Sequence, residues 1–143
     1  MRPTFYALLI AASLIGCQDE ETYDPAVRDS FVGEFAVTDT DAEDGEIEEY
    51  EIKIRKSETN KRYIEILNFA DIMNVAVNAE VQGSTLNIPQ QVFTGNTYIL
   101  TLTGQGSMVN GQLNFTYNFR VKQKSNGEEW DMGGSCQAER LED

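Results

Sequence analysis

The amino-acid sequence predicts an all-β fold, a single antiparallel meander of about eight strands that forms a small barrel or a flattened sandwich. First, apolar and polar residues alternate with a period of two from Phe31 onward, which is typical of strands with one buried face. Second, Asn-Gly and Asp-Gly dipeptides separate the alternating segments and indicate tight hairpins. Consecutive hairpins make a meander, and closing the meander into a barrel removes its exposed edges.

The first half of the meander follows from these patterns in order. A single helical turn over residues 27–30 is predicted to precede the strands. Residues 31–37 form the first strand, since Phe, Gly, Phe and Val share one face. The Asp44-Gly45 turn then leads into residues 50–54, where tyrosine and isoleucine alternate with charged side chains. These two segments are expected to pair as a hairpin.

Shorter segments continue the pattern after this hairpin. A polar turn at residues 57–61 precedes a short strand over residues 64–66. A loop around Asp71 separates this strand from residues 75–81, where valine and alanine alternate with polar residues. We therefore expect a strand on each side of the loop.

Four further strands complete the prediction. Residues 86–88 form a strand that Pro89 ends, because proline cannot donate to the hydrogen-bond ladder. Residues 98–102 follow, and residues 113–121 form a long strand with aromatic side chains on one face. The last strand runs over residues 130–136. Asn-Gly dipeptides precede the last two strands and predict their hairpins.

The N-terminus predicts a lipoprotein signal peptide over residues 1–16. Arg2 precedes a short apolar run that is too brief to cross roughly 30 Å of hydrocarbon as a helix, and this arrangement is typical of secretory signals. The run ends in Leu14-Ile15-Gly16-Cys17, which resembles the bacterial lipobox. The resemblance implies cleavage between Gly16 and Cys17 and acylation of Cys17. An ordinary secretory signal is the alternative.

Residues 17–30 are predicted to be a lipid anchor and an acidic tether. Polar residues follow the cysteine directly: Gln18, Asp19, Glu20 and Glu21. They resemble the acidic export signal of some Gram-negative lipoproteins, which implies an outer-membrane location facing the cell exterior. A solvated spacer is the alternative. The expected partner is therefore the membrane, contacted through the lipid at Cys17.

Residues 31–143 form the predicted folded domain, and three of its segments carry a family resemblance. They are residues 31–35 (FVGEF), residues 75–89 (VAVNAEVQGSTLNIP) and residues 102–116 (LTGQGSMVNGQLNFT). Together they resemble the small lipocalin-like lipoprotein domains of bacteria with an outer membrane. The resemblance implies a barrel fold and an outer-membrane location, and it implies no particular chemistry.

Composition limits the function further. The 143 residues carry 11 basic and 24 acidic side chains and no histidine, for a net charge of −13. Nucleic acid is excluded as a partner because a phosphate-binding surface needs clustered basic residues. Without the commonest general base and metal ligand, the sequence predicts no enzyme, no catalytic residue and no cofactor. Cys136 is predicted to be a buried structural cysteine, with a reactive thiol or an intermolecular disulfide as alternatives.

One acidic segment is a weak candidate for calcium. Its carboxylates are Asp39, Asp41, Glu43 and Asp44. Their spacing fits the start of an EF-hand loop, but the glycine comes one position late and Tyr50 stands where a glutamate should be. We expect a solvated hairpin loop and no dedicated metal site.

The predicted inward face is apolar, and we expect no acidic side chain on it. Its members are Phe35, Val37, Tyr50, Ile52, Ile54, Ile64, Ile66, Val75, Val77, Val81, Leu86, Ile88, Tyr98, Leu100, Leu102, Leu113, Phe115, Tyr117, Phe119 and Val121. These large side chains favour a filled barrel, in which Gly104 and Gly106 relieve crowding. Any ligand would be a hydrophobic small molecule.

The predicted function is a non-enzymatic binding or accessory module. One alternative is a structural subunit that binds an outer-membrane protein and takes no small ligand. A surface hydrolase with a carboxylate pair is the other alternative.

Overall fold

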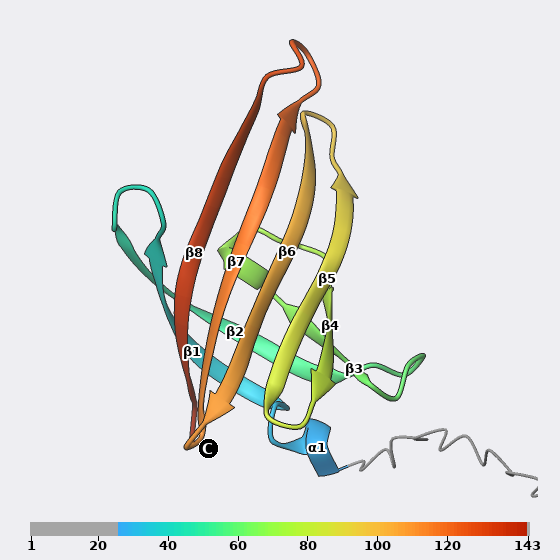
Figure 1. The fold of residues 1–143 in the computed structure, drawn as a ribbon, viewed down its shortest axis with the longest axis vertical. Coiled ribbons are helices and arrows are strands. Elements are labelled where there is room, and N and C mark those ends of the chain that lie inside the picture. The colour runs from blue at the N-terminus through green and yellow to red at the C-terminus, as the bar shows by residue number, and fades with distance from the viewer. Residues whose placement is uncertain (1–25, 143) are drawn as a thin grey trace, which may run out of the picture.

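A computed structural model describes residues 26–142 as a closed barrel of eight antiparallel strands. Each strand pairs with the next along the chain, and the last strand pairs with the first (Figure 1). The elements are α1 (Ala26–Asp29), β1 (Gly33–Asp41), β2 (Ile47–Lys56), β3 (Tyr63–Leu67), the 3₁₀ turn η1 (Phe69–Asp71), β4 (Val77–Gln82), β5 (Thr85–Thr94), β6 (Tyr98–Val109), β7 (Gln112–Gln123) and β8 (Glu129–Arg140). The predicted all-β meander is confirmed, and it closes as a barrel.

The predicted N-terminal features lie outside the described residues. They are the signal peptide over residues 1–16, the cleavage and lipidation site at Gly16 and Cys17, and the acidic residues 18–21. The helical turn predicted before the strands is present as α1. Within residues 26–142, no helix is both long enough and apolar enough to cross a bilayer.

The hairpins of the long strands are formed where the sequence predicts them. Asn110 and Gly111 connect β6 to β7, and both have positive φ, 51° and 78°. A type I′ turn requires this conformation at its two central residues, and Asn and Gly adopt it at low cost. The turn fixes a register of twelve paired residues between β6 and β7, from Val109↔Gln112 to Tyr98↔Gln123.

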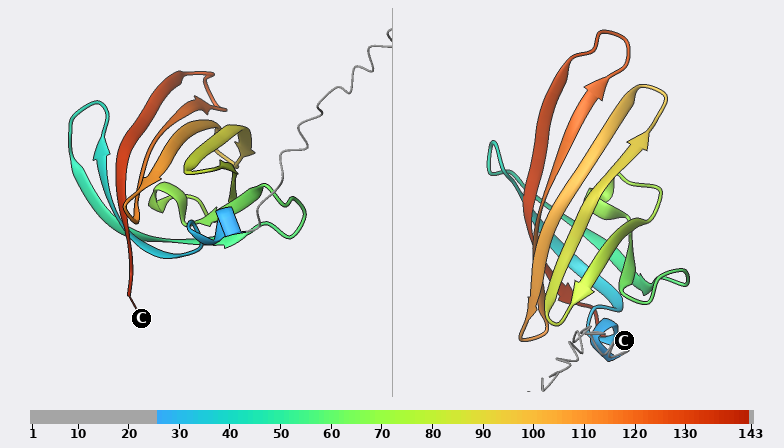
Figure 2. Two further views of the ribbon diagram at one scale, coloured as in Figure 1. Left: turned by 60° about the horizontal axis from the view of Figure 1, so that its bottom comes forward. Right: turned by 45° about the vertical axis from the view of Figure 1, so that its right-hand side comes forward.

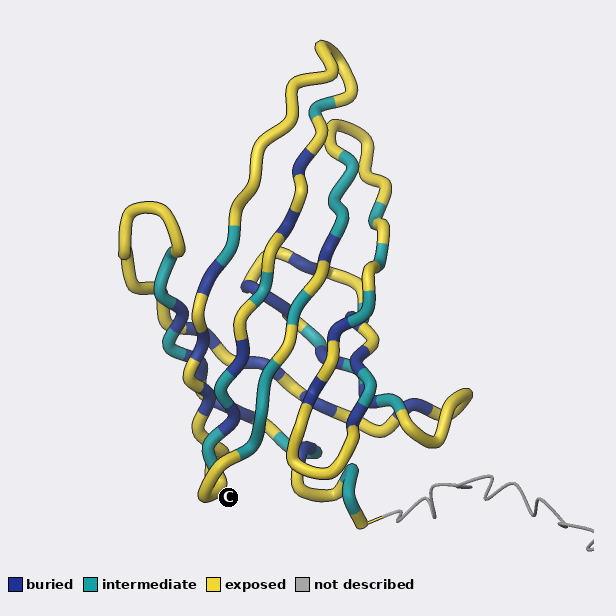
Figure 3. The backbone as a smooth tube through the Cα atoms, in the orientation of Figure 1, coloured by how far each residue is buried: buried dark blue, intermediate teal, exposed yellow. Residues whose placement is uncertain are grey.

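The barrel is uneven in height. The strands β6, β7 and β8 have 12 residues each, whereas β3 has 5 and β4 has 6. Figure 1 shows β5–β8 as a tall curved sheet that rises above the shorter strands crossing behind it. We call the end at which the tall sheet rises above the shorter strands the open end. There the inner face of the tall sheet has no strand opposite it, and the upper part of β8 is exposed (Figure 3).

The predicted inward residues are buried, with two corrections. Val75 is 47% exposed because it lies in the loop before β4, which starts at Val77. Tyr98 is 43% exposed because it begins β6 at the open end. Two other predicted core residues, Leu100 and Tyr117, are half-buried and pack against the core.

The segment η1 fills the centre of the barrel. The Phe69 side chain is fully buried, and its ring centroid lies 5.8, 5.1 and 6.1 Å from those of Phe115, Tyr117 and Phe119 on β7. Figure 2 shows η1 within the ring of strands in the view along the barrel. Edge-to-face aromatic packing of this kind stabilises a core beyond simple burial. The interior at this level is therefore filled by aromatic side chains, as the sequence predicts.

The strand predicted to end at Pro89 continues. Pro89 lies at a register shift between Ile88 and Gln91, and β5 then pairs with β6 up to Thr94. A bulge tolerates proline because one residue there leaves the ladder. The Gln91 side chain accepts a hydrogen bond from the Asn78 amide (2.9 Å) and donates one to its carbonyl (2.8 Å). These two side-chain hydrogen bonds connect β4 to β5 beyond Glu80 and Asn87, where the backbone pairing of the two strands ends.

Candidate functional site

A carboxylate lies inside the barrel, contrary to the prediction of an inward face without acids. Asp39 is 6% exposed and follows Phe35 and Val37 on the inner face of β1. Its Oδ2 accepts hydrogen bonds from the hydroxyls of Tyr50 (2.8 Å) and Tyr117 (2.6 Å). Asp39 therefore continues the period-two pattern of β1 inward, past the point where the sequence prediction ended the strand.

Cys136 completes this polar cluster. Its Sγ lies 3.8 Å from the Tyr50 hydroxyl, whose one proton is donated to Asp39, so the thiol is the donor to Tyr50. Burial, and next the charge of Asp39, raise the pKa of the Cys136 thiol well above its ordinary value. Burial also raises the pKa of Tyr50 and Tyr117, with hydrogen bonds to Asp39 adding to the effect. Cys136 is the buried cysteine that the sequence predicts.

Alkaline pH is expected to destabilise the barrel through this cluster. In the unfolded chain these groups ionise near their ordinary pKa values, 9.0 for cysteine and 10.0 for tyrosine, whereas the folded barrel keeps their protons. Their contribution to the free energy of unfolding is complete below about pH 9 and falls as the pH rises further. Urea unfolding between pH 7 and 11 measures this loss. The Tyr117→Phe variant should lose less stability, and a parent stability independent of pH would contradict the assignment.

The second oxygen of Asp39 is unsatisfied. Oδ1 is buried and accepts no hydrogen bond within the described residues. It lies over Gly134 of β8, where any side chain would collide with it. A buried carboxylate oxygen without a donor is costly, about 1–3 kcal/mol or more. The barrel therefore holds a carboxylate whose capacity for hydrogen bonds is half used.

A small acidic cavity adjoins Asp39 at the open end. Its volume is about 170 Å³, and it lies between the β1–β2 hairpin, η1 and β8. Its lining residues are Asp39, Asp41, Glu46, Glu48, Ala70, Ile72, Tyr117, Met132 and Gly133. Four of these nine residues are carboxylates. We call this recess the acidic cavity.

The carboxylates that were weak calcium candidates make different contacts in the structure. Asp39 points into the barrel, whereas the Asp41 Oδ1 accepts hydrogen bonds from the backbone amides of Glu43 (2.8 Å) and Asp44 (3.1 Å). These bonds lower the pKa of Asp41 and hold the hairpin turn. In residues 26–142, no group of three or more acidic or cysteine side chains is arranged to hold a metal ion. The carboxylates of this segment shape the hairpin and the cavity.

An apolar groove lies on the other side of η1. Its volume is about 560 Å³, and residues 72–75 and 92–98, with Leu100, line it. Its apolar members are Ile72, Met73, Val75, Val92, Phe93, Tyr98 and Leu100. Ile72 lines both this groove and the acidic cavity, so the two recesses flank one side chain. We call this recess the apolar groove.

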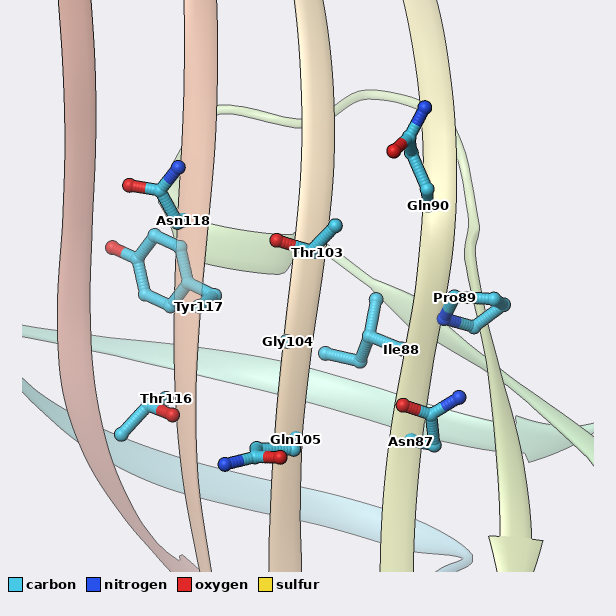
Figure 4. A pocket seen from close by; sticks show the side chains of 10 residues that line it. All are labelled: Asn87, Ile88, Pro89, Gln90, Thr103, Gly104, Gln105, Thr116, Tyr117 and Asn118. Atoms are coloured by element: carbon cyan, nitrogen blue, oxygen red, sulfur yellow. The ribbon is translucent and has the colours of Figure 1, made fainter.

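A third recess lies across β5, β6 and β7. Figure 4 shows Asn87, Gln105 and Thr116 near Gly104, which has no side chain. Asn, Gln and Thr side chains provide most of its lining, and the described residues that line it carry no charge. With mainly amides and hydroxyls, this face offers hydrogen bonds but little apolar contact. The open end of the barrel is thus the better-formed candidate site.

Neither a protein-family model nor a curated protein matches this chain. Among solved structures, it is similar to a protein of unknown function from the DUF3598 family of Nostoc punctiforme, with a TM-score of 0.42 and 14% sequence identity. The match covers 79% of this chain and 48% of that one, so this chain spans about half the length of that protein. The class that the strands themselves define is a closed, eight-stranded antiparallel meander barrel.

Proposed function

We propose that this chain is a lipid-anchored outer-membrane lipoprotein whose lipocalin-like barrel faces the cell exterior and acts as a non-enzymatic binding module. The ligand is a small molecule with an apolar part that lies in the apolar groove at the open end. The observation that carries this proposal is the set of large apolar side chains exposed there. Ile72 is 53% exposed, Val75 47% and Tyr98 43%, in a chain of which 24% is charged.

The dimensions of the apolar groove support a small ligand. At about 560 Å³ it falls within the roughly 300–1,000 Å³ that is typical of small-molecule sites. Each square ångström of apolar surface removed from water contributes about 25 cal/mol, so covering exposed Ile72 and Val75 favours binding. Aromatic surface is available beside the groove, where Tyr98 contacts Trp130 edge-to-face at 5.9 Å between ring centroids.

The polar cluster supports binding over catalysis. The Cys136 thiol is 1% exposed and protonated, and the Tyr50 hydroxyl is already hydrogen-bonded to Asp39. A nucleophile must reach its substrate, and the Cys136 thiol is buried. Their hydrogen bonds instead fix the shape of the interior next to the open end.

Binding of an apolar fluorescent probe to residues 18–143 tests the ligand. This fragment contains every residue of the core, of the acidic cavity and of the apolar groove. The Val75→Asp variant is expected to weaken probe binding about tenfold or more, because it places a charge in the groove. Val109→Asp is the matched control, since Val109 is 53% exposed at the opposite end of β6. Equal binding by both variants would contradict the site, and the subunit alternative would then gain support.

The anchor is tested separately by Cys17→Ala. The variant cannot be acylated, so we expect it to leave the membrane fraction while the parent protein remains there. Two acyl chains bind a bilayer stably, at about 0.8 kcal/mol for each buried CH₂ group. Fractionation of cells followed by immunoblotting measures the distribution. Retention of Cys17→Ala after a high-salt wash would contradict a lipid anchor at this residue.

A further inference from the structure

We propose that the acidic cavity binds a cationic group, a primary ammonium or a guanidinium, carried by the same small molecule whose apolar part lies in the apolar groove. The ligand class is therefore a cationic amphiphile. This inference rests on the proposed function, because it assigns the polar end of that ligand. It depends on three features: an unsatisfied carboxylate, the charge of the cavity, and the continuity of the two recesses.

The unsatisfied carboxylate is Asp39. Its side chain is more than nine-tenths buried and lines the acidic cavity, and its Oδ1 accepts no hydrogen bond within residues 26–142. The hydroxyls of Tyr50 and Tyr117 both donate to Oδ2 and thereby fix the carboxylate in place. A cation in the cavity would lie beside this carboxylate, whose charge the two neutral hydroxyls do not neutralise. Hydrogen bonds between charged groups are roughly twice as strong as neutral ones, which favours a cationic donor.

The charge of the cavity selects the same kind of ligand. Asp41, Glu46 and Glu48 surround the opening, and none of the described lining residues is basic. In the described part of the chain, no lysine or arginine forms an ion pair with these carboxylates or with Asp39. Asp39 is buried and Asp41 is half-buried, whereas Glu46 and Glu48 are exposed. A buried charge attracts a counter-ion more strongly than an exposed one, because water and salt screen it less.

The size and geometry favour an organic cation over a metal ion. Calcium needs six to eight oxygens at about 2.3–2.6 Å, and the described residues hold no such cluster. The volume of about 170 Å³ is well below the roughly 300–1,000 Å³ of sites that enclose a whole small molecule. This space accommodates one ammonium or guanidinium group on a short stem. The rest of the ligand must lie elsewhere.

The apolar groove supplies that place. Ile72 is 53% exposed and lines both recesses, so a molecule that passes over it contacts carboxylates on one side and apolar groups on the other. Met132, 38% exposed, adds apolar surface at the edge of the acidic cavity. A cationic head and an apolar tail match this order of surfaces.

Three probes with the same tail test the inference: hexylammonium, hexanol and hexanoate. Each is titrated calorimetrically into residues 18–143 at several salt concentrations. We expect hexylammonium to bind about tenfold or more tightly than hexanol, and hexanoate to bind more weakly than either. Equal affinities for hexylammonium and hexanol would overturn the cationic site while leaving the proposed function intact. Methylammonium, which carries the cation without the tail, is a fourth probe. If it bound as tightly as hexylammonium, the tail would contribute nothing, and the proposed function would be overturned while the cationic site remained.

Variants locate the cation. Asp39→Asn keeps the shape of the side chain, and it should reduce hexylammonium affinity about tenfold while leaving hexanol affinity unchanged. Glu48→Gln at the exposed rim should reduce it roughly two- to threefold and does not touch the interior. Glu58→Gln removes an exposed acid in the β2–β3 turn and controls for attraction to the net negative charge. An equal loss in Glu58→Gln and Glu48→Gln, with none in a folded Asp39→Asn, would overturn the site.

Discussion

Replacing Phe69 by alanine is expected to destabilise the barrel by about 3–5 kcal/mol, the range for a large aromatic side chain deleted from a core. Phe69 is fully buried and lies among the rings of Phe115, Tyr117 and Phe119. The closed ladder of strands cannot collapse around the missing ring, so the cavity should persist. Domains of this size have about 5–15 kcal/mol of stability, so the loss is a large share of the total.

Urea unfolding measures this effect, with Ile72→Ala as its control on the same segment. Ile72 is 53% exposed, and we expect its truncation to cost less than about 1 kcal/mol. The comparison distinguishes the loss of the buried Phe69 ring from a general effect of substitutions in the segment around η1. Similar small losses in both variants would show that η1 rests loosely on the barrel. The interior would then be available to a ligand, contrary to the filled core described above.

The sequence could predict the strands but not this segment. Alternation identifies the inner faces of β2 and β7 because every second residue repeats the signal. Phe69 is a single apolar residue in a segment without periodicity, and three residues around it have positive φ: Asn68 (61°), Ala70 (54°) and Asp71 (59°). No propensity rule predicts positive φ at an alanine, so packing against β7 must select it.

The buried carboxylate was missed for a different reason. The acid-rich run after Val37 has the composition of a solvated turn, so the sequence prediction ended the first strand there. In the structure β1 continues to Asp41, with Asp39 paired to Glu48 on one side and to Cys136 on the other. Extending the period from Phe35 through Val37 by one more step would have placed Asp39 inside.

The open end depends on tertiary geometry. Alternation places Tyr98 on the inner face of β6, in step with Leu100 and the buried Leu102. The predicted inward set does not include Trp130, which pairs with the buried Val121. Whether an inner face is covered depends on the height of the strands opposite, which no local pattern encodes. The apolar groove and the acidic cavity both lie at this end, so the candidate site could not be located from the sequence.

The second large effect is expected at Gly106 of β6, where alanine should destabilise the barrel by at least the roughly 1–3 kcal/mol typical of overpacked cores. Gly106 pairs directly with Phe115. A Cβ there would lie 2.5 Å from the Phe115 Cβ and 2.9 Å from its Cα, and closer still to the Asn114 carbonyl oxygen. Backbone atoms cannot rotate away as a side chain can, so β6 and β7 would have to separate.

Ser107→Ala is the matched control for this prediction. Ser107 is the next residue of β6 and points outward, so its substitution should change the free energy of unfolding by no more than about 0.5 kcal/mol. Urea unfolding compares the two variants, and near-ultraviolet circular dichroism reports the packing of the aromatic rings on β7. A neutral Gly106→Ala would mean that β6 and β7 separate easily. The glycine would then serve some purpose other than the close approach of these strands, and the aromatic core around Phe69 would be more adaptable than its packing indicates.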